Sequence, residues 1–129
     1  MAQLTPYLAV RDARAAITWY VEQLGAAVTY EPVVMPDGRI GHVELDLDGA
    51  HWMMADEHPE IHVEAPASDR GAAVTLHLRV DDVDGIAARV SAAGAVLDRG
   101  PEEAGPGRVA VFRDPFGHRW FLNAPSGSA

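Results

Sequence analysis

The sequence predicts an α+β fold built from two copies of one βαβββ module. In each half, a segment with apolar residues at helical spacing ends at a glycine. A glycine-containing turn follows it, and a further glycine precedes a strand with aromatic residues. The paired segments are Val10–Gly25 and Val80–Gly94, Pro36–Arg39 and Gly105–Arg108, and Gly49–Met53 and Gly117–Phe121. The copies are separated by 70 residues at Val10 and Val80, and by 68 residues at Gly49 and Gly117. Two copies are too few for a solenoid, so the repeat indicates two similar modules about a pseudo-twofold axis, with any pocket where equivalent strands converge.

The first module is expected to contain a strand, a helix and three further strands. Asp12 suits the N-cap of the helix and Gly25 its C-terminal end. Along residues 42–48 every second residue is apolar, which predicts a strand with one buried and one polar face. The expected elements are a strand over Leu4–Val10, the helix between Asp12 and Gly25, a strand near Ala26–Val34, a turn at Asp37–Gly38, the strand over residues 42–48 and a strand over His51–Ala55.

The second module repeats this order, and the length indicates one domain. With 129 residues the chain can bury a single core, divided into a first module at 1–56, a linker at 57–72 and a second module at 73–125. The linker is long for a plain connection, so it is expected to lie across the domain or to reach a partner subunit. The expected elements are a strand over Val74–Val80, a helix over Val83–Ala93, and strands over Ala95–Arg99, Val109–Arg113 and Trp120–Asn123.

Composition excludes several classes of protein. The chain contains no cysteine, which rules out disulfides and thiolate chemistry. Its formal net charge of −9 argues against a nucleic-acid partner, because little would neutralise phosphates. The start of the chain resembles no secretory signal, and no apolar run is long enough to span a bilayer. We therefore expect a cytoplasmic protein without a membrane partner.

Several motifs on this repeat resemble the vicinal oxygen chelate superfamily, which includes glyoxalase I, extradiol dioxygenases and bleomycin-type antibiotic-binding proteins. The resemblance is strongest to the small glyoxalase-like and bleomycin-resistance-like members and covers nearly the whole chain. It implies that the two modules form a curved mixed sheet around a cavity. The motifs are Thr5-Pro6-Tyr7-Leu8, Arg11-Asp12-Ala13, Ala16-Ile17-Thr18-Trp19-Tyr20 and Asp114-Pro115-Phe116-Gly117-His118-Arg119-Trp120.

The resemblance also implies where a metal would bind. Enzymes of the family place His, Glu or Gln on the first and last strand of each module, and here those positions are Thr5, Met53, Thr75 and Phe121. Threonine, methionine and phenylalanine are poor ligands for a divalent cation of this kind. We therefore expect no metal and no other cofactor.

A displaced metal site is the alternative. His77 lies two residues from Thr75, and His51 lies two residues from Met53, so each pair shares a strand face. Together with Glu44, these histidines could bind a metal if the alignment slips. Scattered histidines are more often surface residues or hydrogen-bonded, which favours the metal-free interpretation.

The remaining candidates describe a pocket for a flat organic molecule. By strand alternation, Trp52 and Trp120 are expected to pack under the helices rather than to line the pocket. Aromatic and methionine walls with a few polar anchors favour binding over chemical conversion. The candidate ligand-binding residues are Thr5, Tyr7, His42, Glu44, His51, Met53, Thr75, His77, Phe112, Phe121 and Asn123.

These features predict a metal-free protein that sequesters a hydrophobic or aromatic natural product, as antibiotic-resistance members of the family do. A homodimer is expected, because such folds often build their clefts at twofold interfaces. Two alternatives remain open: a metal-dependent glyoxalase-like lyase, isomerase or dioxygenase, and a scaffold whose cavity no longer binds anything.

Overall fold

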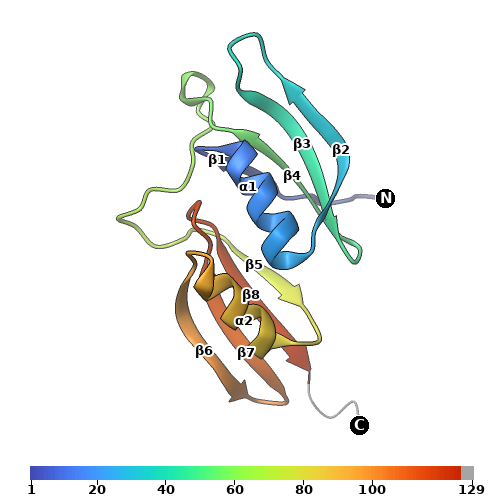
Figure 1. Ribbon diagram of the computed structural model, residues 1–129, viewed down its shortest axis with the longest axis vertical. Helices are drawn as coiled ribbons and strands as arrows, with labels where there is room; N and C mark the ends of the chain where they lie inside the picture. The colour runs from blue at the N-terminus through green and yellow to red at the C-terminus, as the bar shows by residue number, and fades with distance from the viewer. Residues whose placement is uncertain (126–129) are drawn as a thin grey trace. The chain divides into compact units, whose positions relative to one another are not determined.

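The computed structural model describes residues 1–125 and divides into two compact units. Unit 1 comprises Met1–Pro66 and unit 2 begins at Ala67. Each unit contains one four-stranded sheet in which the first strand pairs in parallel with the last, and the remaining pairs are antiparallel (Figure 1). The prediction of an α+β fold built from two βαβββ modules is confirmed.

Unit 1 has the strand order β1-β4-β3-β2. Its hydrophobic face is covered by α1, and Val43, Leu45, Trp52 and Met54 from the central strands are almost fully buried. The elements are β1 (Tyr7–Val10), α1 (Ala13–Trp19), the π-helical turn η1 (Tyr20–Leu24), β2 (Ala27–Val34), β3 (Ile40–Leu47), β4 (Ala50–Asp56) and the 3₁₀ turn η2 (Pro59–Ile61).

Both ends of the first helix lie where the sequence predicts them. The side chain of Asp12 accepts a hydrogen bond from the Ala15 amide at 3.1 Å, as an N-cap does. Gly25 closes the last turn with a left-handed φ of 79°, a conformation that glycine adopts without steric cost. The change from α-helix to π-helix after Trp19 was not predicted. Trp19 and Tyr20 are consecutive there, and both are buried.

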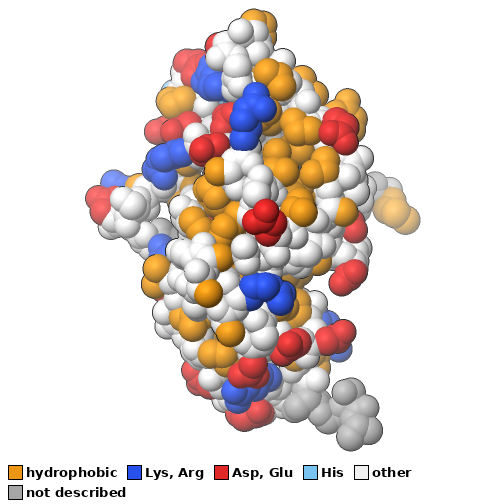
Figure 2. Space-filling view, viewed as in Figure 1, with side chains coloured by type: hydrophobic (Ala, Val, Ile, Leu, Met, Phe, Trp, Pro, Cys, Tyr) orange, Lys and Arg blue, Asp and Glu red, His pale blue; other side chains and the backbone are white. Residues whose placement is uncertain are grey.

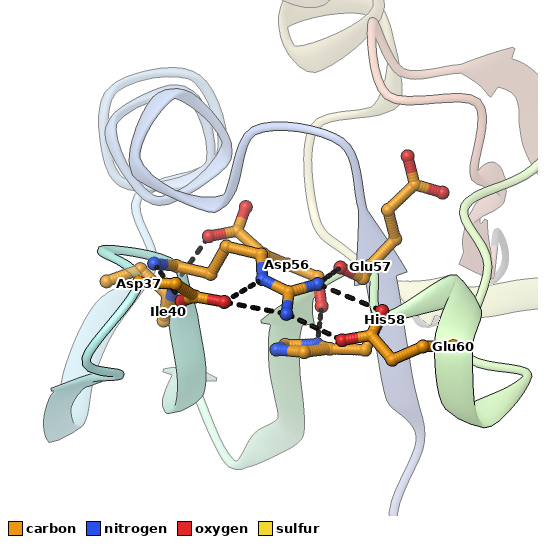
Figure 3. A network of polar contacts seen from close by, with 7 residues as sticks. Asp37, Ile40, Asp56, Glu57, His58 and Glu60 are labelled. Atoms are coloured by element: carbon orange, nitrogen blue, oxygen red, sulfur yellow. Dashed lines mark hydrogen bonds and ion pairs between the residues drawn. The ribbon is translucent and has the colours of Figure 1, made fainter.

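A polar network fastens the end of β4 to α1 and β3 (Figure 3). Asp56 accepts the amide of Ala13 at 2.7 Å and the amide of Ile40 at 2.6 Å, so one carboxylate joins a helix N-terminus to a strand. Beside it, the Arg39 guanidinium donates to both carboxylate oxygens of Glu60, at 3.2 and 2.6 Å, and also to Asp37. Residues 57–66, expected to be part of the linker, therefore belong to unit 1.

Replacing Glu60 with glutamine should make stability less dependent on pH. Hydrogen bonds from Arg39 lower the pKa of Glu60 from 4.5 to about 2. A lowered pKa in the folded state means that this pair stabilises the fold above pH 4.5 and loses its contribution as pH falls towards about 2. The melting temperatures of wild type and Glu60→Gln should therefore converge over that range. In an Arg39→Ala background the substitution should have no such effect, and a persistent difference there would assign the pH dependence to another group.

Unit 2 has the strand order β5-β8-β7-β6, and its helix covers the face that carries Leu78, Trp120 and Leu122 (Figure 1). Asp82 caps this helix by accepting a hydrogen bond from the Gly85 amide at 2.9 Å. The elements are β5 (Thr75–Arg79), α2 (Val83–Ala92), β6 (Val96–Ala104), β7 (Gly107–Arg113) and β8 (Arg119–Pro125).

The turn between β7 and β8 is organised by one buried carboxylate. Asp114 is 4% exposed and accepts hydrogen bonds from the amides of Phe116 and His118, at 2.9 and 3.0 Å. Its second oxygen accepts the indole N–H of Trp120 at 2.9 Å. The Asp114–Trp120 segment singled out in the sequence is thus a structural turn, in which one acidic side chain satisfies three donors.

Both units have a proline in the outer strand that follows the helix. Pro32 lies in β2 and Pro101 in β6, and each strand is at the edge of its sheet. The pairing register shifts at both places, between Tyr30 and Val33 and between Arg99 and Glu102. Proline lacks the amide that a central strand needs, so its position fits an irregular edge strand.

The surface combines apolar and charged groups. In the view of Figure 2, hydrophobic side chains gather on unit 1, with charged side chains around them. Exposed apolar residues of that unit include Val21, Val33, Val34 and Met35. Within residues 1–125, no helix combines the length and the hydropathy that a bilayer-crossing segment requires.

Candidate functional site

The open face of the unit 1 sheet carries a row of four side chains from four strands. Strand pairing places Tyr7 opposite Met53, Met53 opposite Glu44, and Glu44 opposite Tyr30. Because side chains alternate between faces, this row lies opposite the buried residues packed beneath α1. Tyr7, Glu44 and Met53, expected to bind a ligand, thus lie together on one face of unit 1.

Two histidines flank Glu44 and share its carboxylate. His42 Nε2 lies 2.8 Å from Oε2 of Glu44, and His51 Nε2 lies 2.8 Å from Oε1. The hydroxyl of Tyr7 lies 2.7 Å from His42 Nδ1 and 3.2 Å from the carbonyl oxygen of Gly41. These contacts form a chain, Tyr7–His42–Glu44–His51, which we call the polar chain.

The carboxylate at the centre of the polar chain determines the direction of its hydrogen bonds. Hydrogen bonds from His42 and His51 lower the pKa of Glu44, so this group is a carboxylate near neutral pH and can only accept. Both histidines therefore donate through Nε2. In the neutral form of His42, Nδ1 is then an acceptor for the Tyr7 hydroxyl. Partial burial and the Glu44 charge raise the pKa of Tyr7, so the phenol keeps its proton.

The inner part of the polar chain is shielded, whereas its outer end is open. The side chains of Glu44 and His42 are 20% and 25% exposed, and Tyr7 is 54% exposed. Tyr7 and Tyr30 both pack edge-on against the His42 ring, with ring centroids 5.3 and 5.5 Å away. A ligand on this face would therefore meet the Tyr7 hydroxyl first.

Unit 2 contains a pocket of about 430 Å³ at the end of the β6–β7 hairpin. His77 and Phe121 are paired across β5 and β8, and their rings stack with centroids 5.4 Å apart and planes inclined at 21°. Asn123 supplies an amide on the same face of β8. The rest of the lining is mostly apolar and consists of Ala104, Pro106, Gly107, Val109 and Pro125.

Gly107 keeps this pocket open at its base. A Cβ at this position would lie 3.0 Å from the side-chain oxygen of Asn123 and 3.0 Å from the backbone oxygen of Ala124. These distances are closer than ordinary van der Waals contact, so a larger residue would displace the amide that the pocket presents. The pocket thus combines a flat aromatic platform with one amide anchor.

Three of the candidate residues, Thr5, Thr75 and Phe112, belong neither to the polar chain nor to the lining of the unit 2 pocket. Thr5 is partly exposed and precedes β1. Thr75 is exposed, and its hydroxyl accepts a hydrogen bond from Arg119 at 2.9 Å. Phe112 was expected as a wall, but it is fully buried and stacks on Trp120, with centroids 6.3 Å apart. It shares the helix-covered face with Trp120, because its position in β7 pairs with that residue.

The expectation that both tryptophans lie beneath the helices is confirmed. Trp52 and Trp120 are each 3% exposed. Asp48 was expected on the polar face of the third strand, but it lies in the turn before β4, with a φ of 49°. The strand β3 ends at Leu47, one residue earlier than predicted, so its polar face carries His42, Glu44 and Asp46 but not Asp48.

The donor set does not fit the metal site that the fold suggests. The corresponding positions contribute Thr5 and Met53 in unit 1, and Thr75 and Phe121 in unit 2. Across the part of the chain that the structure describes, no three histidine, aspartate or glutamate side chains are placed to hold one metal ion. In the polar chain, Nε2 of His42 and Nε2 of His51 each form a hydrogen bond with Glu44, so these nitrogens do not point together at a shared metal position.

Sequence reasoning missed the part of the unit 2 pocket formed by the hairpin end. Gly105-Pro106-Gly107 was interpreted only as a turn, and Pro125 lies beyond the last predicted strand. The pairing of β7 with β8 extends to Gly107 and Pro125, which brings both segments to Phe121 and Asn123. The apolar residues around this hairpin, Ala104, Pro106 and Val109, were the signal in the sequence that could have indicated a pocket wall.

Residues 2–122 match the model of the Glyoxalase/Bleomycin resistance protein/Dioxygenase superfamily. The chain belongs to this superfamily. An uncharacterized protein of Mycobacterium tuberculosis, Rv0887c, is 39% identical over 126 residues, which cover 95% of this chain and 74% of the relative.

Solved structures of the superfamily include proteins linked to antibiotics. TnmS3, an antibiotic binding protein from Streptomyces sp. CB03234, is 30% identical and has a TM-score of 0.63, and the match covers 97% of this chain and 98% of that one. The fosfomycin resistance protein FosX from Mesorhizobium loti has a TM-score of 0.70 and covers 98% and 94% of the two chains. At 16% identity, FosX shows similarity of fold alone.

Proposed function

We propose that this member of the glyoxalase/bleomycin resistance superfamily binds and sequesters a flat, hydrophobic or aromatic small molecule without altering it. The observation that carries the proposal is the unit 2 pocket, where the stacked rings of His77 and Phe121 form one wall and Asn123 presents an amide. Aromatic faces favour stacking of a planar ligand, while a few polar groups fix its orientation. The 30% identity to the antibiotic binding protein TnmS3 supports an antibiotic as the small molecule.

Sequestration can be tested by recovering the bound compound. The purified protein would be titrated with a panel of planar aromatic antibiotics, and the compound that binds would be incubated with it and examined by mass spectrometry. We expect full recovery of unchanged compound at one equivalent of protein, and higher resistance in cells that express the gene. A product formed in molar excess over protein would show that the protein is an enzyme.

Removing metal should leave this protein unchanged. Because the four family positions hold threonine, methionine and phenylalanine, protein purified without chelator should carry no stoichiometric zinc, nickel, iron or manganese. A chelator should alter neither its melting temperature nor its affinity for the compound identified above. Elemental analysis and thermal unfolding with and without chelator provide the measurements. One equivalent of metal whose loss abolishes binding would contradict the proposal.

A further inference from the structure

We propose that the open face of unit 1 recognises a weakly acidic hydroxyl group, a phenol or an enol, and that the polar chain accepts its proton so that the ligand binds as an anion. This inference rests on the proposed function in that it concerns the class of small molecule that the protein binds. It is carried by the contacts of Tyr7, His42 and Glu44, and not by the unit 2 pocket.

The two partners of the Tyr7 hydroxyl give it two hydrogen-bonding states. When His42 is neutral, the Tyr7 hydroxyl donates to Nδ1 at 2.7 Å, which leaves its oxygen lone pairs free to accept from a ligand. When His42 is protonated, Nδ1 becomes a donor to the Tyr7 oxygen, and the Tyr7 proton must turn to another acceptor. The Gly41 carbonyl oxygen at 3.2 Å is such an acceptor in the free protein, and a ligand oxygen would be another.

These two states define a balanced proton transfer. The ligand hydroxyl donates its proton to the Tyr7 oxygen, while the former Tyr7 proton moves to Nδ1 of His42. The ligand becomes an oxyanion that accepts a hydrogen bond from Tyr7, and His42 becomes an imidazolium that still donates through Nε2 to Glu44. No proton leaves the site, and Tyr7 is a phenol both before and after the transfer.

A carboxylate faces the imidazole nitrogen of His42 that points away from Tyr7. Glu44 provides a carboxylate 2.8 Å from Nε2, which would pair with the imidazolium that the transfer forms. A charge-assisted hydrogen bond in partly buried surroundings is about twice as strong as a neutral one. The other ionisable groups of the cluster are His51, on the second oxygen of Glu44, and Asp46, 3.9 Å from His51 Nδ1.

One carboxylate at the centre of the polar chain and another beside His51 make this face selective. Glu44 and Asp46 repel an anion that approaches from solution. A ligand that is already ionised should therefore bind less tightly than a neutral ligand that delivers its own proton. A carboxylic acid, ionised near neutral pH, therefore fits this face poorly. A neutral hydroxyl on an aromatic or conjugated ring fits it best, because its charge forms only beside His42.

The test uses two small probes, 4-nitrophenol and its methyl ether 4-nitroanisole, at a pH below that at which free 4-nitrophenol ionises. The phenolate of this probe absorbs at longer wavelength than the phenol, so the spectrum of bound probe reports its protonation state directly. We expect wild-type protein to bind 4-nitrophenol on the order of tenfold more tightly than 4-nitroanisole, and to show the phenolate band.

Two variants remove the proton acceptor without removing the surface. Tyr7→Phe deletes the hydroxyl that meets the probe, and His42→Gln deletes the group that takes up the proton. Both should lose the phenolate band and the preference for 4-nitrophenol. Val21→Ala is the control and should leave the preference unchanged, because Val21 is 39% exposed on η1, in the helix that covers the opposite face of the sheet. Circular dichroism checks that each variant is folded, and the second variant decides the test if one of them is not.

The outcomes separate this inference from the proposed function. Equal affinity for the two probes, with 4-nitrophenol bound as the neutral phenol, overturns the inference and leaves small-molecule binding intact. Failure of folded wild-type protein to bind either probe also overturns it, while the antibiotic panel decides the proposed function independently. A phenolate band that persists in both Tyr7→Phe and His42→Gln would assign the proton to another group and overturn the inference as well.

Discussion

Replacing Asp114 with alanine should lower the free energy of unfolding by about 3–5 kcal/mol, because each buried donor left without an acceptor costs about 1–3 kcal/mol and three donors lose theirs. The substitution leaves three donors without their acceptor: the amides of Phe116 and His118 and the indole N–H of Trp120. Chemical denaturation monitored by tryptophan fluorescence gives the measurement, because Trp120 is 3% exposed in the folded protein.

The control for this prediction is another aspartate of the same unit. Asp98 accepts ion-pair contacts from Arg113 and Arg119, each at 3.2 Å, and its side chain is 28% exposed. Solvent can replace those contacts, so Asp98→Ala should cost at most about 1 kcal/mol. Similar losses for the two variants would show that the turn beneath Trp120 does not depend on its carboxylate.

Replacing Phe121 with alanine should weaken binding of the sequestered compound by about 1–3 kcal/mol, the range for losing one well-packed aromatic contact. Phe121 forms the stacked platform with His77, and its removal takes away both apolar area and the partner that holds the His77 ring. Isothermal titration of the compound identified in the antibiotic panel provides the measurement.

Leucine at the same position separates the two contributions of Phe121. Phe121→Leu keeps much of the apolar area but no ring, so it should lie between wild type and Phe121→Ala if stacking contributes. Val96→Ala, at a 62% exposed position of β6, is the control in the same unit and should leave the affinity unchanged. Wild-type affinity in Phe121→Ala would contradict the assignment of the unit 2 pocket.

Much of the fold could be predicted because local chemistry and the repeat agree. Asp12 and Gly25 sit at the ends of the first helix, where side-chain capping and a left-handed glycine satisfy the helix termini. The alternation around Val43 and Leu45 predicted which face of β3 is buried, since both residues are fully buried. Helix caps and strand alternation depend on residues that are close in the sequence, so they can be predicted from one sequence alone.

The parts that could not be predicted depend on register between distant strands. Phe112 has the composition of a pocket wall, but its pairing with Trp120 places it beneath α2. His42, Glu44 and His51 were recognised as candidates, yet their hydrogen bonds depend on how β3 pairs with β4. Asp56 was placed at the end of the first module, and its contact with the Ala13 amide joins residues 43 positions apart. No local pattern reports such contacts.

The prolines of β2 and β6 have a consequence for the behaviour of the chain in crowded solution. An outer strand with regular, unpaired amides invites a strand from another molecule, and this is a common route to aggregation. Pro32 and Pro101 have no amide hydrogen, and each lies in an outer strand at a place where the register is already irregular. A foreign strand cannot continue a regular ladder past either point. The two prolines thus interrupt intermolecular β-sheet growth along β2 and β6 by the same means.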